Sequence, residues 1–182
     1  MKLSNKIVLI TGGTSGIGLE AAKLLREEGA TVIVVGQNPA RLQAAASQLG
    51  DGVTVLRGDV SKPAEIERII KRVSEKFGRI DVVFANAGMG IASPLDGVSE
   101  DQIDTQFDVN FKGVFFTIQK ASPLLAKGGS IVVTTFVPQR SRRSRPVHSV
   151  GHESSRSFAC AVVGRRVRCF SGAPSRSRWQ AD

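Results

Sequence analysis

The stretch that decides the fold is Thr11-Gly12-Gly13-Thr14-Ser15-Gly16-Ile17-Gly18, or TGGTSGIG. It follows the apolar run KIVLIT at residues 6–11 and precedes a segment whose apolar residues have helical spacing. A glycine-rich turn between a strand and a helix lets the backbone approach a pyrophosphate, and the N-terminus of the helix favours an anion. A tight turn without a ligand is the alternative, and the strand–turn–helix context argues against it.

Short apolar runs continue to alternate with helical patterns as far as residue 136. Strands are predicted at residues 6–11, 31–36, 53–57, 81–85 and 130–135, because these runs are β-branched and apolar on both faces. Three helices are predicted between them, with these apolar stripes: Ile17, Ala21, Leu24 and Leu25, closed by Gly29; Ile66, Ile69, Ile70, Val73 and Phe77, from Ser61 and Pro63 to Gly78; and Ile103, Phe107, Phe111, Val114, Phe115 and Ile118, up to Lys120. This repetition predicts an α/β fold with a Rossmann-type doubly wound parallel sheet, incomplete at about five strands.

The composition changes abruptly near residue 136. The 182-residue chain has a net charge of +9, yet residues 1–136 hold 15 lysines and arginines against 14 aspartates and glutamates. Residues 137–182 hold ten arginines, no lysine and only two acidic residues, and the chain contains no tyrosine. We therefore predict a dinucleotide-binding domain over 1–136 and an irregular, Arg/Ser-rich basic tail over 137–182. Chemistry that needs a phenol is excluded.

Other classes of site find little support. The two cysteines, Cys160 and Cys169, match no metal-ligand spacing and do not require a disulfide, so no metal site is expected. No apolar run approaches the roughly 20 residues of a membrane span, and the N-terminus does not resemble a signal peptide. A cytoplasmic protein without a membrane partner is the expectation.

Three further motifs follow the glycine-rich turn in order along the chain. They are Gly58-Asp59-Val60 after the third predicted strand, Asn86-Ala87-Gly88 after the fourth, and Val109-Asn110 in the long helix. Together with TGGTSGIG, over about residues 3–135, the chain resembles the classical short-chain dehydrogenase/reductase family. Singly, Asp59 could cap a turn and Asn110 could be an exposed polar residue of a helix.

The resemblance implies a nicotinamide dinucleotide cofactor, a small carbonyl or alcohol substrate, and a homo-oligomer as a further partner. It assigns Asn110 to catalysis, as the organiser of a proton-relay water, and Asp59 to the adenine. The cofactor-binding residues that it implies are Gly12, Thr14, Ser15, Gly16, Ile17, Gly18, Gln37, Asp59, Val60, Asn86, Ala87 and Gly88.

The choice between NAD and NADP depends on the end of the second predicted strand. An acidic side chain there accepts from the ribose 2′-OH of NAD, and a cationic one favours the 2′-phosphate of NADP. The residues are Gly36-Gln37-Asn38, which are neither acidic nor basic, and the nearest cation, Arg41, is best interpreted as a solvated residue on a helix face. The missing acid favours NADP.

The resemblance stops at the fifth predicted strand. Family members carry a catalytic Ser after it and then Tyr-x-x-x-Lys, but here Phe136 stands at the Ser position and no lysine follows Lys127. Phenylalanine donates no hydrogen bond. The expected function is therefore an NAD(P)-dependent oxidoreductase whose hydride transfer is defective in this form, with a non-enzymatic nucleotide-binding or interaction module as the alternative.

Two interpretations of the tail remain open. In the weaker of the two interpretations, the tail is an arginine-rich arm that binds nucleic acid. Alternatively the tail is read out of frame: shifted codons for 152–156 can encode Thr-Lys-Ala-Ala, as in the family, although Ser149 cannot yield the Tyr. Such a truncated domain would leave the fifth strand at a sheet edge and uncover the apolar side of the helix over 103–120. We expect it to be marginally stable and prone to association.

Overall fold

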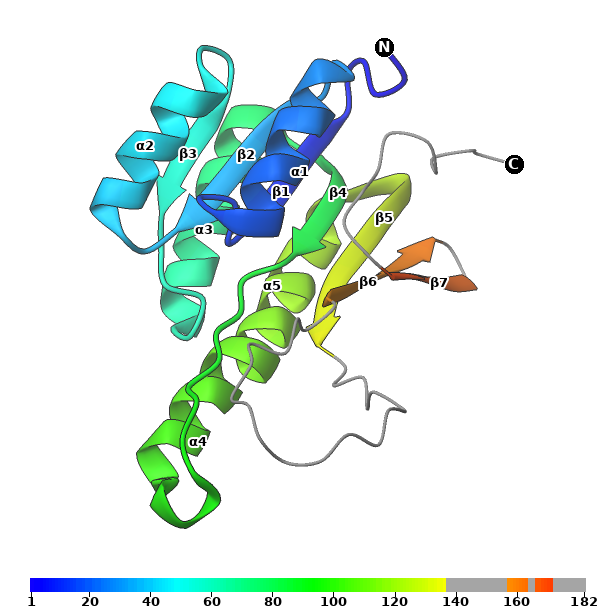
Figure 1. Ribbon diagram of the computed structural model, residues 1–182. Helices are drawn as coiled ribbons and strands as arrows, with labels where there is room; N and C mark the ends of the chain where they lie inside the picture. Colours follow the sequence, from blue (N-terminus) through cyan, green and yellow to red (C-terminus); the bar gives the residue numbers. More distant parts are fainter. Residues whose placement is uncertain (137–156, 164–165, 172–182) are drawn as a thin grey trace, which may run out of the picture.

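The computed structural model describes residues 1–136, 157–163 and 166–171 of the chain (Figure 1). Five parallel strands form the centre: β1 (Ile7–Thr11), β2 (Thr31–Gly36), β3 (Thr54–Arg57), β4 (Ile80–Ala85) and β5 (Leu125–Phe136). Their order in the sheet is β3-β2-β1-β4-β5. The predicted Rossmann-type parallel sheet is confirmed.

Helices connect these strands. They are α1 (Gly16–Glu27), α2 (Pro39–Leu49), α3 (Pro63–Phe77), α4 (Glu100–Phe107) and α5 (Gly113–Ala121), with a π-helical turn at Asp108–Lys112 and 3₁₀ turns at Leu95–Gly97 and Ser122–Leu124. Within the described residues, no helix combines the length and the apolar character needed to cross a membrane.

Both faces of the sheet are covered, and the alternation of side chains along β1 shows how. Ile7 and Leu9 pack in one core cluster with Ile66 and Val73 of α3. The intervening residues of β1 pack in a second cluster with α1 and α2, whose members include Val8, Ile10, Leu19, Ala22, Ala45 and Leu49. Because successive side chains of a strand point to opposite faces, the four consecutive apolar residues at 7–10 supply both cores.

The helix predictions need three corrections. The helix α2 was not predicted, because its alanine-rich sequence has only a weak apolar stripe, although Asn38 caps it through Arg41 N and Pro39 stands in its first turn. The helix α3 begins at Pro63 with Lys62 at the N-cap, not at Ser61. In α1 the predicted stripe is correct only in part: Ala21 and Leu25 pack against the core, but Ile17 is 42% exposed, and Leu19 and Ala22 are the side chains buried in it.

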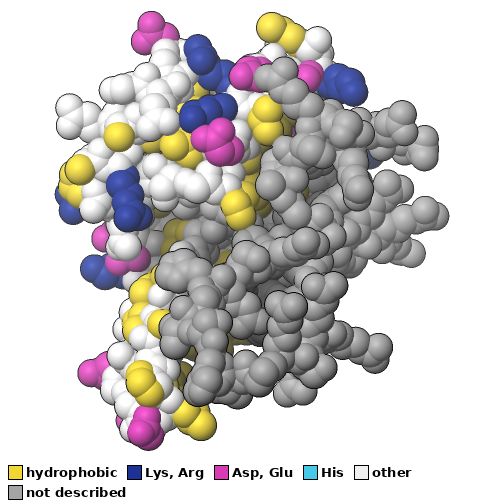
Figure 2. Space-filling view, in the orientation of Figure 1, with side chains coloured by type: hydrophobic (Ala, Val, Ile, Leu, Met, Phe, Trp, Pro, Cys, Tyr) yellow, Lys and Arg dark blue, Asp and Glu magenta, His cyan; other side chains and the backbone are white. Residues whose placement is uncertain are grey.

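The predicted helix over 103–120 is interrupted by the π-helical turn between α4 and α5. Its apolar side is uncovered, as expected: Ile103, Phe107, Phe111 and Phe115 are between 48% and 57% exposed. The rings of Phe107 and Phe111 stack with their centroids 4.8 Å apart. Figure 2 shows hydrophobic side chains gathered at the end of the molecule where α4 lies. We call the three phenylalanines Phe107, Phe111 and Phe115, together with Ile103, the aromatic stripe.

Two strands lie within the segment predicted to be an irregular tail. They are β6 (Ser157–Val163) and β7 (Arg166–Ser171). The strand β6 pairs antiparallel with β5, and β7 pairs antiparallel with β6. The expectation that the fifth strand forms a sheet edge is therefore wrong, because β6 takes up its outer hydrogen-bonding groups. The other residues of the tail, with both histidines, lie outside the described residues.

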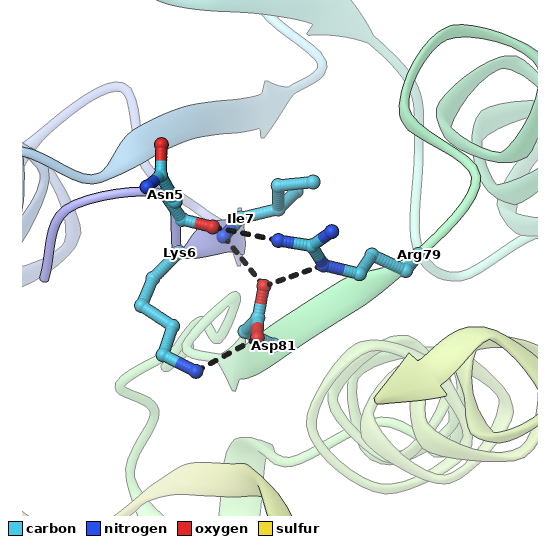
Figure 3. A network of polar contacts seen from close by, with 5 residues as sticks. All are labelled: Asn5, Lys6, Ile7, Arg79 and Asp81. Atoms are coloured by element: carbon cyan, nitrogen blue, oxygen red, sulfur yellow. Dashed lines mark hydrogen bonds and ion pairs between the residues drawn. The ribbon is translucent and has the colours of Figure 1, made fainter. Parts of the chain in front are cut away.

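An ionic cluster joins β1 and β4 at their amino ends (Figure 3). The Asp81 carboxylate accepts hydrogen bonds from Ile7 N at 3.0 Å, Lys6 Nζ at 3.1 Å and Arg79 Nε at 3.3 Å. Arg79 also donates to the carbonyl of Asn5, which has a left-handed φ of 64°. Burial opposes ionisation of Asp81, but the three donors outweigh it and hold the pKa of the carboxyl below its ordinary value.

Candidate functional site

The glycine-rich turn joins β1 to α1 and is packed too closely for side chains at two positions. Gly12 has a φ of +66°, and a Cβ there would lie 2.8 Å from Ala87 Cα. A Cβ on Gly18 would overlap the Gly12 carbonyl oxygen and lie 2.6 Å from Asn86 Nδ2. The turn, the first helix and the segment after β4 therefore meet with backbone against backbone, which only glycine allows.

The N-terminus of α1 is open. Ser15 is extended at the N-cap, its side chain makes no capping hydrogen bond, and no acidic residue stands in the first turn. Gly16 has a φ of +54°, and a Cβ on it would meet nothing within 4 Å. The first N–H groups of a helix need partners, and here the described side chains supply none. This geometry fits a phosphate group, which would accept from these N–H groups next to the positive end of the helix dipole.

A network of uncharged groups fixes the segment after β4 to its neighbours. Thr11 Oγ1 accepts from the backbone N–H groups of Asn86 and Ala87, both at 3.2 Å. Asn86 Nδ2 donates to the Gly12 carbonyl at 3.2 Å, and Thr134 Oγ1 donates to Asn86 Oδ1 at 2.9 Å. Thr134 was not predicted, because it belongs to no motif. Its position near the carboxyl end of β5, beside the strand β4 that Asn86 directly follows, was the available signal.

Asp59 caps a turn, as the alternative interpretation of this residue had it. Its Oδ1 accepts from Ser61 N at 3.0 Å and from Ser61 Oγ at 2.7 Å, and its own N–H donates to Glu65 Oε2 at 2.8 Å. These contacts hold the carboxylate at the carboxyl end of β3. The next residue, Val60, is only 8% exposed and packs against Gly113, where a Cβ would lie 3.0 Å from Val60 Cγ2. Val60 thus belongs to the core.

The end of β2 contains no charged side chain. Gln37 is exposed. Asn38 Oδ1 accepts from Arg41 N at 3.0 Å and is engaged in capping α2. Arg41 itself is exposed in the first turn of that helix. Among residues 36–41, Arg41 therefore carries the one charged side chain, and none of them carries a carboxylate.

Asn110 lies in the π-helical turn, and its amide is already paired. Asn110 Oδ1 accepts from Met89 N, and its Nδ2 donates to the carbonyl of the same residue, each at 2.8 Å. A Cβ on Gly88 would lie 3.3 Å from that Oδ1. The side chain of Asn110 thus fastens the segment after β4 to the long helix, and in this arrangement both ends of its amide are occupied.

The predicted site residues lie in the glycine-rich turn, after the carboxyl ends of β2, β3 and β4, and in the π-helical turn. In open α/β sheets this edge is where ligands bind. The arrangement can hold an anionic dinucleotide through backbone N–H groups. Phe136, the residue at which the resemblance predicts a serine, is the last residue of β5.

Comparison with known proteins agrees with a dinucleotide-binding fold. Residues 6–143 match the family model for short chain dehydrogenases. The chain is 43% identical over 135 residues to the oxidoreductase asL5 of Sarocladium schorii, which covers 73% of this chain and 54% of that protein. The chain thus spans about half the length of the curated relatives that it matches.

Solved structures are similar as well. A short chain dehydrogenase from Burkholderia cenocepacia J2315 in complex with NADP is 34% identical with a TM-score of 0.69, over 73% of this chain and 56% of that one. The 3-ketoacyl-(acyl-carrier-protein) reductase from Brucella melitensis, complexed with NADH, is 32% identical with a TM-score of 0.64, over 67% of this chain and 51% of that one. The match over residues 6–143, on a parallel sheet with a glycine-rich turn, shows that the chain belongs to the short-chain dehydrogenase family.

Proposed function

We propose that residues 1–136 bind a nicotinamide dinucleotide at the carboxyl edge of the sheet, as part of an oxidoreductase that exchanges hydride at a carbonyl or alcohol carbon. The observation that carries this proposal is the uncapped N-terminus of α1, which follows a turn closed by Gly12, Gly18 and Asn86. The NADP and NADH complexes of similar structures support it.

Each group at the edge has a role in this proposal. The first-turn N–H groups of α1 and the backbone around Ser15 and Gly16 hold the pyrophosphate, and Asp59 lies toward the adenine. The bound dinucleotide would supply the hydride chemistry. Because no carboxylate stands at Gln37 and Asn38, we propose a preference for NADP over NAD.

Turnover by this chain should be very low. The family's serine position holds Phe136, the chain has no tyrosine, and no lysine follows Lys127. Asn110 is the one member of the catalytic set at its family position, and both ends of its amide are bonded to Met89. With no phenol and no serine hydroxyl at the reacting carbon, the chain would bind the cofactor without an efficient proton donor.

Titration with NADPH and NADH, followed by nucleotide fluorescence, tests binding. A panel of small carbonyl compounds tests turnover. The expected result is saturable binding, tighter for NADPH, with negligible oxidation of either nucleotide. The proposal of a dinucleotide site would be overturned by the absence of binding to both nucleotides. Rapid turnover would overturn the proposed defect.

A role in association is the second candidate, and the aromatic stripe on α4, the π-helical turn and α5 favours it. Four large apolar side chains there are each about half exposed, and exposed apolar patches of this kind mark interaction surfaces. We propose that this side pairs with a further copy of the chain. Light scattering behind a sizing column should show a dimer that Phe111→Asp converts to monomer, and a monomeric unsubstituted chain would refute this.

A further inference from the structure

We propose that Thr134 is a positioning residue of the dinucleotide site: its hydroxyl sets the orientation of the Asn86 amide, which in turn holds the Gly12 carbonyl in the glycine-rich turn. This inference rests on the proposed function. It concerns a residue of β5, a strand that contributes no motif to the cofactor-binding residues predicted from the sequence.

The orientation of the amide follows from the chemistry of its two neighbours. The Gly12 carbonyl oxygen can only accept, so the end of Asn86 that faces it at 3.2 Å must be the donor, Nδ2. The other end, Oδ1, then faces Thr134 Oγ1 at 2.9 Å, and the threonine hydroxyl must donate. A flipped amide would set Oδ1 against the Gly12 oxygen, which is repulsive. Thr134 therefore satisfies the one orientation that holds the turn.

Little space is left for the amide to move. A Cβ on Gly12 would lie 3.2 Å from Asn86 Nδ2, and one on Gly18 would lie 2.6 Å from the same atom. Nδ2 is thus enclosed by the turn on one side and by α1 on the other. A small rotation of the Asn86 side chain would press on the backbone that precedes the N–H groups at the start of α1.

The backbone of the same segment is held independently. Thr11 Oγ1 accepts from the N–H groups of Asn86 and Ala87. Loss of the Thr134 hydroxyl therefore leaves the segment joined to β1 and changes only the side chain of Asn86. For this reason we expect ligand binding to suffer more than stability when the hydroxyl is removed.

The neighbouring residues offer a matched set of variants in the full chain. Thr134→Val removes the hydroxyl and keeps the branched shape that suits a strand. Thr134→Ser keeps the hydroxyl. Thr135→Val makes the same change one residue further on, at an exposed threonine. Each variant is titrated with NADPH, its melting temperature is measured, and the side-chain amide signals of Asn86 are followed by ¹⁵N NMR.

We expect Thr134→Val to raise the Kd about fivefold, the equivalent of one net hydrogen bond, and to shift the Asn86 amide signals. Thr134→Ser should restore binding to within about twofold of the unsubstituted chain, and Thr135→Val should change neither measurement. Equal binding by Thr134→Val and the unsubstituted chain would overturn this inference alone, as would a loss in Thr134→Ser as large as that in Thr134→Val. An unsubstituted chain that binds no dinucleotide would overturn the proposed function, and this inference with it.

Discussion

Neighbouring central strands are joined by charged groups at their amino ends and by uncharged groups at their carboxyl ends. At the amino ends of β1 and β4, the buried carboxylate of Asp81 draws together Lys6, Arg79 and the N–H of Ile7. At the carboxyl ends of β1, β4 and β5, Thr11, Asn86 and Thr134 make hydrogen bonds between uncharged groups. In the centre of the sheet, therefore, the amino ends of the strands are joined by an ion cluster and the carboxyl ends are joined by uncharged groups.

The difference follows from the proposed position of the ligand, which lies at the carboxyl ends of the strands and not at their amino ends. A carboxylate with three donors is satisfied by the protein itself and adds stability at a place where no ligand is needed. An anionic pyrophosphate would be repelled by such a group. Hydroxyl and amide groups can fix the strands beside an open helix N-terminus without opposing an anion. Changes at the amino end should therefore alter stability alone, and changes at the carboxyl end should alter binding as well.

The largest effect is expected for Gly18→Ala. The new Cβ would overlap the Gly12 carbonyl, a backbone atom that cannot move aside as a side chain could. We expect a loss of about 2–3 kcal/mol in the free energy of unfolding, which outweighs the gain of about 1 kcal/mol that alanine brings inside a helix, and a loss of NADPH binding. Urea denaturation and nucleotide titration measure the two effects.

Gly90→Ala is the matched control for this change. Gly90 has an ordinary φ, and a Cβ there would meet nothing within 4 Å. It should leave stability and binding unchanged. If Gly18→Ala bound NADPH as tightly as Gly90→Ala, the close packing at the carboxyl end would have no bearing on the ligand.

Next comes Asp81→Ala, which removes the centre of the ionic cluster. The side chain of Asp81 is 7% exposed, and those of Lys6 and Arg79 are about half exposed, so the two cations regain water when the carboxylate is lost. We expect a loss of about 2 kcal/mol, chiefly from the charged hydrogen bonds and the N–H of Ile7. At a low temperature, at which the Asp81→Ala variant is still folded, it should bind NADPH with unchanged affinity. A large rise in Kd would contradict the proposed division between the two ends.

A smaller effect is expected for Thr11→Val at the carboxyl end. It leaves two backbone N–H groups without their acceptor, at a side chain that is almost completely buried. We expect a loss of about 1–2 kcal/mol in stability together with weaker NADPH binding. Thr11→Ser should recover both, because it keeps the hydroxyl oxygen. Unaltered binding by Thr11→Val would show that the network is purely structural.

The smallest expected effect is a pH dependence of the free energy of unfolding, which arises from Asp81 at the amino ends of the strands. Because the pKa of Asp81 lies below its ordinary value of 3.8 in the folded chain, its ionised form favours folding. This contribution is complete above the ordinary value and is lost as the pH falls through the lowered pKa. The stability difference between the unsubstituted chain and Asp81→Asn should therefore shrink below about pH 4. Urea denaturation across that range measures the difference, and a constant value would refute the assignment.

The sequence was sufficient for the sheet because burial on both faces leaves a plain signal. The run from Ile7 to Ile10 is apolar at successive positions, and its strand β1 lies in the centre of the sheet, as predicted. The helix α2 was missed, since alanine-rich helices carry a weak stripe, yet Asn38-Pro39 was a usable start signal. The edge prediction for β5 was wrong, because antiparallel pairing with β6 depends on long-range register that local patterns do not encode.

The site could be predicted where a family motif carried it, and not elsewhere. Asn86 and Asn110 were identified by their motifs, but the partners that orient them, Thr134 and the backbone of Met89, come from other elements. Val60 shows the limit of a motif: the resemblance assigns it to the cofactor, but no motif indicates that its side chain is buried against Gly113. The spacing of motifs along the chain predicts which residues lie at the carboxyl edge of the sheet. The side chains that contact them there depend on tertiary packing, which the motifs do not encode.

The π-helical turn at Asp108–Lys112 determines where the long helix can lose a residue without changing the surface that it presents. Such a turn holds one residue more than an α-helical turn. Removing one residue there would restore a continuous α-helix and leave the turns on either side in phase. Removing Val114 from the first turn of α5 would instead rotate everything before it by about 100° relative to everything after it. Ile103 and Phe107 would then leave the side on which Phe115 stands.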